Sequence, residues 1–234
     1  MWLDDASLAA PGSVWVSASM MRWSTPSGHG IDAPAIGAAI GLTRRAQMSL
    51  AVPYSRVTSD GDALASGGLG DVYAGIKIQI AEPTERRIGL SVSPTLEILT
   101  SATTRRTGLV LPASVEIALG QTRAYGSAGL FTRGAAFVTG AVERYVSERV
   151  LVTGALLQSW TTADVTASET YGLNRTRTDL TGMVTVFAGP SAAFFGGITR
   201  TLSAQEFDSA RFALSGGISI AVIPPSVVPI RPPR

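Results

Sequence analysis

The chain has 234 residues, of which 45% are hydrophobic and only 15% are charged, and its formal net charge is +2. The charged share is well below the quarter that is usual in soluble domains, and the nearly balanced charge gives no support for nucleic-acid binding. Without cysteine the chain has no disulfide or thiolate metal site, and a single histidine offers little for other metals. We expect one domain without metal or cofactor.

Neither end of the chain has the pattern of a membrane helix. No run approaches the roughly 18 apolar residues that such a helix needs, and the start, MWLDDASLAAPG, lacks the basic and long apolar regions of a signal peptide. Either the chain is cytosolic or a signal has already been removed. The end, IPPSVVPIRPPR, has five prolines in residues 224–234, which predicts an extended tail.

About twelve segments of 9 to 14 residues alternate between apolar and small polar residues, and none has convincing helical periodicity. In the clearest, Ile76, Ile78 and Ile80 alternate with Lys77 and Gln79. The segments have the length of tilted membrane strands. They lie near 13–23, 34–43, 47–58, 70–81, 87–100, 107–119, 123–132, 136–147, 149–161, 178–188, 192–203 and 210–222.

The connections between these segments alternate in length. Long ones follow odd segments, as in WSTPSGHGIDAP after the first and TTADVTASETYGLNRTRTD after the ninth, whereas tight turns such as TRRAQ and GPS follow even ones. The short TRGA, after an odd segment, is the exception. Outer-membrane barrels have this rhythm, with short periplasmic turns and longer external loops.

Alternation alone also fits a soluble barrel or sandwich whose apolar face points inward. The polar faces here carry mostly Gly, Ser, Thr and Ala, not the Lys and Glu of a solvated surface, which favours the membrane barrel. We therefore predict an all-β protein, a closed antiparallel up-and-down transmembrane β-barrel of about 12 strands in an outer membrane.

This barrel is expected to span residues 13–223, between a periplasmic N-terminal extension (residues 1–12) and a Pro-rich periplasmic tail (residues 224–234). The apolar face would contact outer-membrane lipid, and the polar face would line a narrow or partly blocked lumen. The tail is a candidate to contact a periplasmic partner.

Polar and charged residues of the wet faces are the candidates to line the lumen. Two interpretations stay open for them: a structural ion-pair network that rigidifies or plugs the barrel, because unpaired charge is costly in a confined site, and a lining that selects solutes. The candidates are Asp71, Tyr73, Lys77, Gln79, Glu97, Glu116, Glu143, Arg22, Arg200 and Arg211.

Two prolines inside predicted strands, Pro94 and Pro112, each remove a ladder hydrogen bond. In a hairpin about SATTRR, Pro94 is expected opposite Pro112 or Ala113. Such a weak level is either a lateral opening for an apolar solute or a bulge that bends the sheet, and we favour the bulge.

The remaining motifs give no support for catalysis. His29 lies near Ser27 and Asp32, but a flexible loop is a poor place for the rigidly oriented base of His–Ser–acid chemistry, so we interpret it as a solvated loop residue. The glycines of GGLGDVYAG are followed by a strand, whereas a dinucleotide fingerprint requires a helix. We expect no enzyme activity.

The segment GGLGDVYAGIKIQI resembles an element of the bacterial outer-membrane barrels of the MetA-pathway of phenol degradation family. Gly68, Leu69, Gly70 and Asp71 match the run that opens a strand after an external loop, and the preceding MSLAVPYSRV is also similar, so the resemblance covers residues 48–80. It implies an outer-membrane barrel that passes small, aromatic or apolar solutes.

Near the end of the chain, Ser215, Gly217, Ile220 and Val222 resemble the signal that hands barrels to the barrel-assembly machinery, although no aromatic residue closes the chain. Our leading expectation is passive passage of small-molecule solutes. The alternative is a structural barrel that anchors a partner through the loop at 161–179 or through the Pro-rich tail.

Overall fold

The computed structural model describes residues 4–59, 66–85, 87–100, 107–161, 176–204 and 210–222. Among these residues, no helix is long and apolar enough to cross a membrane. Their regular elements are strands: β1 (Val14–Thr25), β2 (Gly28–Thr43), β3 (Ala46–Ser59), β4 (Ser66–Leu69), β5 (Val72–Ala81), β6 (Gly89–Val92), β7 (Thr95–Ile98), β8 (Thr107–Leu119), β9 (Thr122–Phe131), β10 (Ala135–Ser147), β11 (Val150–Thr161), β12 (Thr176–Phe187), β13 (Ala192–Ala204) and β14 (Phe212–Val222).

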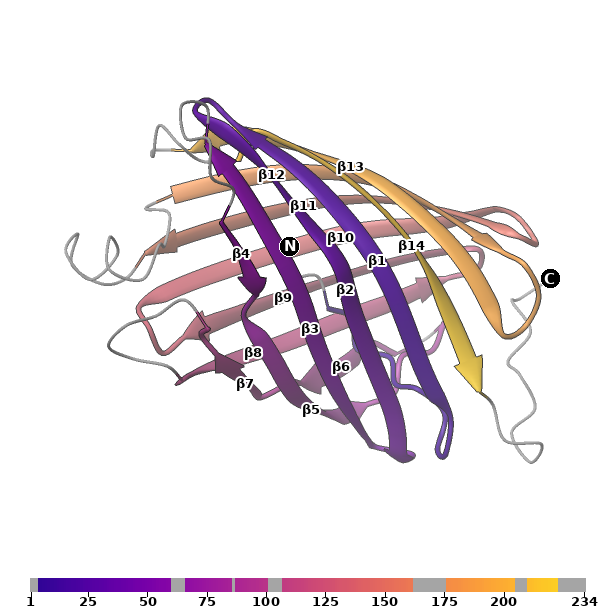
Figure 1. The fold of residues 1–234 in the computed structure, drawn as a ribbon. Helices are drawn as coiled ribbons and strands as arrows, with labels where there is room; N and C mark the ends of the chain where they lie inside the picture. Colours follow the sequence, from indigo (N-terminus) through magenta and orange to yellow (C-terminus); the bar gives the residue numbers. More distant parts are fainter. Residues whose placement is uncertain are drawn as a thin grey trace.

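The strands form one closed antiparallel barrel (Figure 1). Apart from β4–β5 and β6–β7, strands adjacent in sequence pair with one another, and β1 closes the wall by pairing with β14 from Val14↔Val222 to Ser24↔Phe212. Strands β4 and β5 share one position beside β3, and β6 and β7 share one position between β5 and β8. The wall is therefore a 12-strand barrel, as predicted.

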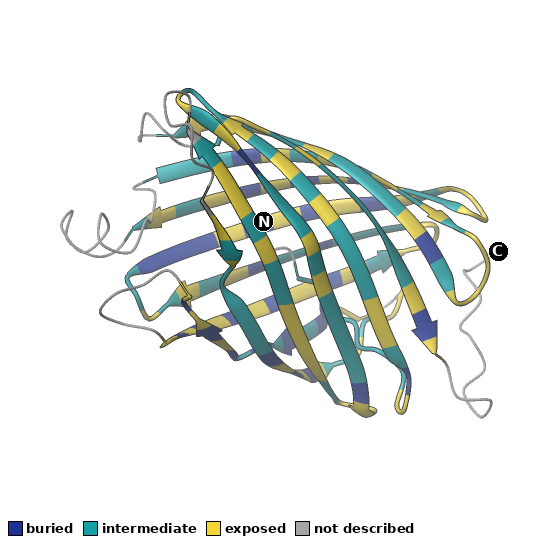
Figure 2. Cartoon of the chain, in the orientation of Figure 1, coloured by how far each residue is buried: buried dark blue, intermediate teal, exposed yellow. Residues whose placement is uncertain are grey.

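Exposure alternates along the strands (Figure 2). In β5 the side chains of Ile76, Ile78 and Ile80 are 46%, 45% and 56% exposed, whereas Lys77 and Gln79 are 9% exposed. Large apolar side chains thus cover the outside of the wall and polar ones the inside. This is the arrangement of a membrane barrel and the reverse of a soluble one.

The two rims of the barrel differ in the length of their connections. At the rim that we call the tight-turn rim, β2–β3, β8–β9 and β10–β11 are joined by two residues each, and β1 starts and β14 ends there. At the opposite rim, the loop rim, strands flank segments 60–65, 101–106 and 162–175, which lie outside the described residues. Outer-membrane barrels have this asymmetry, with short periplasmic turns at one rim and longer external loops at the other.

The first connection at the loop rim corrects the prediction of a long loop at WSTPSGHGIDAP. Strands β1 and β2 continue through this segment and turn at residues 26–27, with Trp23 opposite Gly30. A Cβ atom at Gly30 would clash with the indole of Trp23, so glycine lets the large ring lie against β2. The sequence predicts a loop here because the strands contain several residues that favour turns.

The strand pairing around Pro94 and Pro112 also differs from the prediction. Residues pair across β6–β8 and β7–β8 in one continuous register, from Gly89↔Glu116 to Ile98↔Thr107, which places Ser93, not Pro94, opposite Pro112. The amide of Ser93 donates to Pro112 O at 3.0 Å, and that of Ile76 donates to Pro94 O at 3.0 Å. Pro94 thus interrupts the strand without shifting its register, and the backbone stays joined at this level.

Candidate functional site in the lumen

The N-terminal segment, residues 4–13, lies within the barrel at the tight-turn rim. The Gly12 amide donates to Gly41 O at 2.7 Å, and the Gly41 amide donates to Ser13 O at 3.0 Å. A Cβ atom at Gly41 would clash with the carbonyl oxygen of Ala10, so glycine lets the segment cross β2 closely. Residues 4–12, expected as an extension outside the barrel, instead contact its inner face.

Lys77, the only lysine of the chain, holds this segment from the inner face of β5. Its Nζ lies 2.5 Å from Oδ1 of Asp4 and 3.2 Å from Oδ1 of Asp5. It also donates to the carbonyl oxygens of Asp5 and Ser7, at 3.2 and 3.3 Å. An ammonium with three donors is thus shared among four acceptors of one short segment.

Arg123 of β9 extends the same network around the wall. Its Nη1 lies 3.0 Å from Oδ2 of Asp5 and 3.3 Å from Oε1 of Glu116, and its Nε lies 2.6 Å from Oε2 of Glu143. Glu143 also accepts hydrogen bonds from the hydroxyls of Tyr125 and Thr153, at 2.7 and 3.2 Å. The segment and three strands are therefore joined by one set of charges.

Hydrogen bonds from Glu116, Gln79 and Ser93 of the wall complete the contacts of the segment. Glu116 Oε2 accepts from the amide of Ala6 at 3.1 Å and from Ser7 Oγ at 2.8 Å. Gln79 Nε2 donates to Ala6 O at 2.8 Å, and the hydroxyl of Ser93 donates to Asp4 Oδ2 at 2.8 Å. These partners come from β5, β8 and the stretch between β6 and β7, so the segment rests against one side of the lumen.

A second cluster lies nearer the loop rim. The carboxylate of Glu97 is fully buried, with Arg133 Nη2 3.0 Å from its Oε1 and the Tyr73 hydroxyl donating to it at 3.2 Å. Asp71, between β4 and β5, accepts a hydrogen bond from the Thr100 amide at 3.1 Å. Oε1 of Glu97 is thus held by Arg133 and Tyr73.

The side of the lumen formed by β13, β14 and β1 is different. Along these strands the exposed apolar series, such as Phe194, Ile198, Ile220 and Met20, faces outward, so the intervening residues face the lumen. These inner residues, which we call the neutral strip, carry no charge: Ala193, Phe195, Gly197, Thr199, Thr201, Ala213, Ser215, Gly217, Ser219, Ser17, Ser19, Met21 and Trp23.

The structure places Tyr73, Lys77, Gln79, Glu97, Glu116 and Glu143 on the inner face, with Asp71 beside them. The lumen prediction is wrong for Arg22 and Arg200, which are exposed and alternate in phase with the outward Met20 and Ile198. Arg211 is exposed immediately before β14 and lines a hollow of the outer wall with Arg200.

Sequence reasoning missed Asp4, Asp5, Arg123 and Arg133. Arg123 lies two residues from Tyr125 on the polar face of its strand, and this alternation could have identified it. Nothing local could have identified Asp4, because its partner Lys77 lies far along the chain.

His29 and Asp32 are not placed together as His–Ser–acid chemistry would require. His29 pairs with Ser24 on the outer face of the wall, whereas Asp32 pairs with Met21 on the inner face, so the two side chains lie on opposite sides of the sheet. Within the described ranges, no group of three His, Cys, Asp or Glu side chains could hold a metal ion.

Comparison with solved structures identifies the fold. The chain is similar to an outer membrane channel from Pseudomonas putida F1, with a TM-score of 0.72 and 14% identity over 95% of this chain and 100% of that one. The chain has the fold of an outer-membrane β-barrel. The NanC porin (TM-score 0.60, 9% identity, 88% of this chain and 98% of that one) and the KdgM porin (0.59, 7%, 90% and 99%) are also similar.

No family model and no curated protein matches the sequence. At identities of 14% and below, the likeness to these barrels concerns the fold.

Proposed function

We propose that the protein is an outer-membrane channel that passively passes small uncharged molecules, including apolar and aromatic ones, along the neutral strip. The observation that carries this proposal is the division of the lumen. The charges on the side of β5, β8, β9 and β10 are bound to one another and to the N-terminal segment. The strip of β13, β14 and β1 offers small, hydroxylated and apolar side chains.

Pore lining determines which solutes cross a barrel. The transfer of an uncharged solute from water to a lining of Ser, Thr, Gly and Ala costs little free energy of solvation. Side chains such as Met21 and Phe195 can also contact apolar solutes. The fold shared with channels and porins supports passage through the lumen. The resemblance of residues 48–80 to the MetA-pathway of phenol degradation family favours apolar or aromatic solutes, as does the absence of charge on the strip.

One observation favours the alternative of a structural barrel without transport. The N-terminal segment occupies part of the lumen at the tight-turn rim and is bound there by ion pairs and hydrogen bonds. If the segment and the neutral strip together leave no path, the barrel is an anchor and not a channel.

Single-channel recording in planar bilayers tests the proposal with two substitutions of neighbouring residues. Ser17→Trp places a large ring on the neutral strip, whereas Ala18→Trp places the same ring on the outer face, since Ala18 lies opposite Ile218 and Ile36. We expect a steady current in the wild type and a clearly smaller one in Ser17→Trp. The current of Ala18→Trp should equal that of the wild type. An added aromatic alcohol should interrupt the current of the wild type.

A wild-type barrel that is folded but silent would support the structural alternative. Equal currents in all three proteins would show that the ions do not pass along the neutral strip. Migration in electrophoresis with and without heating shows whether each variant is folded.

A further inference from the structure

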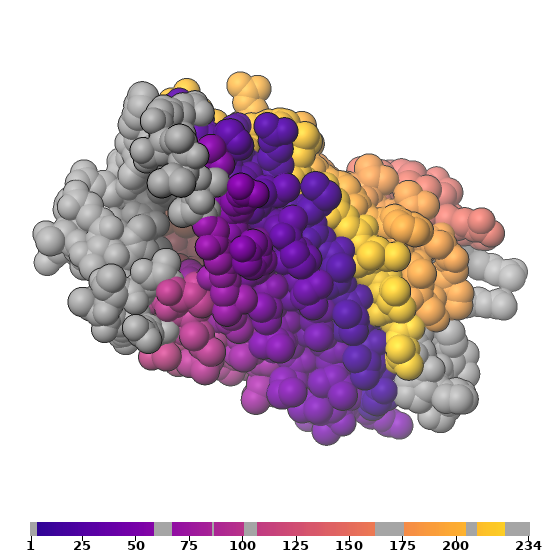
Figure 3. Space-filling model, in the orientation of Figure 1, coloured from indigo at the N-terminus to yellow at the C-terminus, as the bar shows by residue number. Residues whose placement is uncertain are grey.

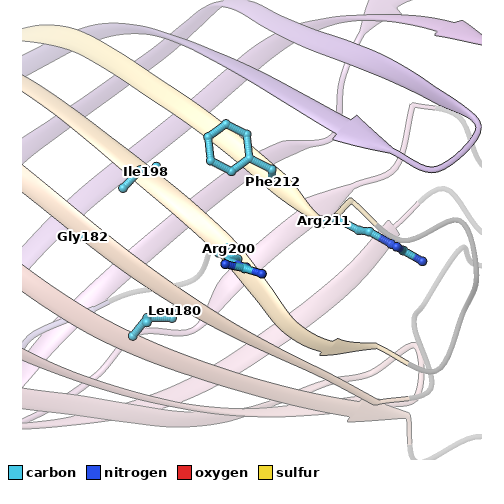
Figure 4. Close-up of a pocket in the computed structure, with 6 residues that line it drawn as sticks. All are labelled: Leu180, Gly182, Ile198, Arg200, Arg211 and Phe212. Carbon is cyan, nitrogen blue, oxygen red and sulfur yellow. The ribbon is translucent and has the colours of Figure 1, made fainter.

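The outer surface carries a second feature, distinct from the lumen. A hollow of about 420 Å³ opens on the outside of β12, β13 and the start of β14 (Figure 4). Its floor is apolar, with Leu180, Ile198 and Phe212 exposed by 48%, 47% and 38%. Arg200 pairs with both Leu180 and Phe212, which places this residue between two apolar ones on the outer wall.

A glycine deepens the hollow. Gly182 lies opposite Ile198 on the outer face of β12, and a Cβ atom there would meet its nearest neighbour, Ile198 Cγ2, only at 4.0 Å. The neighbouring outward positions of β13 and β14 are also glycines, Gly196 and Gly216, which pair with each other. Missing side chains on adjacent strands leave room for an alkyl chain against the wall.

Two further arginines of the outer wall lie to one side of this hollow. Arg22 and Arg56 also face outward, on β1 and β3, and both lie opposite Ile31 of the intervening strand. Arg22, Arg56 and Arg200 lie three, three and four residues from the loop-rim ends of their strands. Near the membrane interface an outward arginine costs little, because its side chain reaches the headgroups.

No acidic side chain offsets these arginines within the described parts of β13, β14, β1, β2 and β3. The one carboxylate of these strands, Asp32, pairs with Met21 and Ser55 on the inner face. No ion pair joins Arg22, Arg56 or Arg200 to a described residue. Figure 3 looks onto this sector, where the yellow β14 runs between the indigo and purple strands β1–β3 and the orange β13.

We propose that this sector, together with Arg200 and the hollow at its β13 edge, binds the phosphorylated lipid of the external leaflet, lipid A. An apolar hollow beneath a guanidinium matches an acyl chain attached to a phosphate. Arginine binds phosphate through two parallel hydrogen bonds. The strands that carry Arg200 and Arg22 are separated by one strand, about 10 Å across the sheet, so two phosphates of one lipid can be held.

The experiment uses the full chain refolded in detergent free of lipopolysaccharide, with diphosphorylated lipid A as the probe. Native mass spectrometry measures the bound fraction at increasing lipid concentration. Arg200→Gln removes the central charge, and Gly182→Leu fills the hollow without a change of charge. Arg144→Gln is the matched control, because Arg144 is an exposed arginine of β10 near the tight-turn rim.

We expect one tightly held lipid A on the wild type and on Arg144→Gln, and at least about tenfold weaker binding to both Arg200→Gln and Gly182→Leu. A dephosphorylated lipid A should bind weakly to all four proteins. The proposal is overturned if Arg200→Gln binds as the wild type does, if the dephosphorylated lipid binds equally well, or if phosphatidylglycerol competes on equal terms. Gly182→Leu keeps the test decisive if Arg200→Gln fails to fold.

Discussion

Lys77→Met tests whether ion pairs hold the N-terminal segment in the lumen. Methionine keeps an unbranched side chain of similar length and removes the ammonium that lies 2.5 Å from Asp4 and 3.2 Å from Asp5. Asp4 then retains only hydroxyl donors, such as Ser93, whereas Asp5 retains Arg123. The docked segment would hold a carboxylate without a cation.

The size of the effect follows from the burial of these groups. Removing one partner of a buried ion pair costs about 3–5 kcal/mol. The side chains of Asp4 and Asp5 are 19% and 22% exposed, so we take the lower end of that range. At about 1.4 kcal/mol per factor of ten, a loss of about 3 kcal/mol raises the undocked fraction on the order of a hundredfold.

A single thiol reports this fraction, because the chain has no cysteine. Ser7→Cys places the thiol in the docked segment, and its reaction with a large maleimide requires undocking. In this background we expect Lys77→Met to react up to about a hundredfold faster, and Lys77→Arg much less so, since arginine keeps the charge. Equal rates for Lys77→Met and the parent would refute the role of the ion pairs, provided that the barrel is folded.

Two further substitutions probe the same network. Gly41→Val should also speed the thiol reaction, because its Cβ would clash with Ala10 O, whereas Gly140→Val, with no atom within 4 Å of the new Cβ, should not. Glu143→Gln weakens an acceptor of three hydrogen-bond donors and should lower the free energy of unfolding in urea by about 2 kcal/mol. Glu148→Gln, in an exposed turn, should leave that free energy unchanged.

The wall of the barrel could be predicted from sequence because its two faces follow a period of two. Ile76 and Lys77 have opposite exposures as adjacent residues, and this contrast recurs along most strands. The predicted strand boundaries are wrong where the composition of a segment favours a turn but the segment pairs with neighbouring strands. Residues 28–34 are rich in turn formers, yet they belong to β2, because residues 28–32 pair with both β1 and β3.

The lumen was harder to predict, for two physical reasons. Arg22 and Arg200 were assigned inward because they are charged, although alternation with Met20 and Ile198 already placed them on the apolar face. Near the interface that face tolerates arginine. The docking of Asp4 on Lys77 depends on a contact between distant parts of the chain, which no local pattern contains.

The sign of the charge in the lumen leads to a last prediction, on ion selectivity. The network around the N-terminal segment contains four carboxylates, Asp4, Asp5, Glu116 and Glu143, and two cations, Lys77 and Arg123, an excess of two negative charges. Confined charge attracts counter-ions where water cannot fully screen it. Any ion current should therefore favour potassium over chloride.

The zero-current potential across a gradient of potassium chloride measures this preference. It should show cation selectivity that weakens as salt rises, because the Debye length falls to about 3 Å at 1 M. Glu116→Gln should reduce the selectivity, since Glu116 carries one of the four carboxylates. Anion selectivity in the wild type would mean that ions cross without passing the network, since two cations cannot outweigh four carboxylates on the same path.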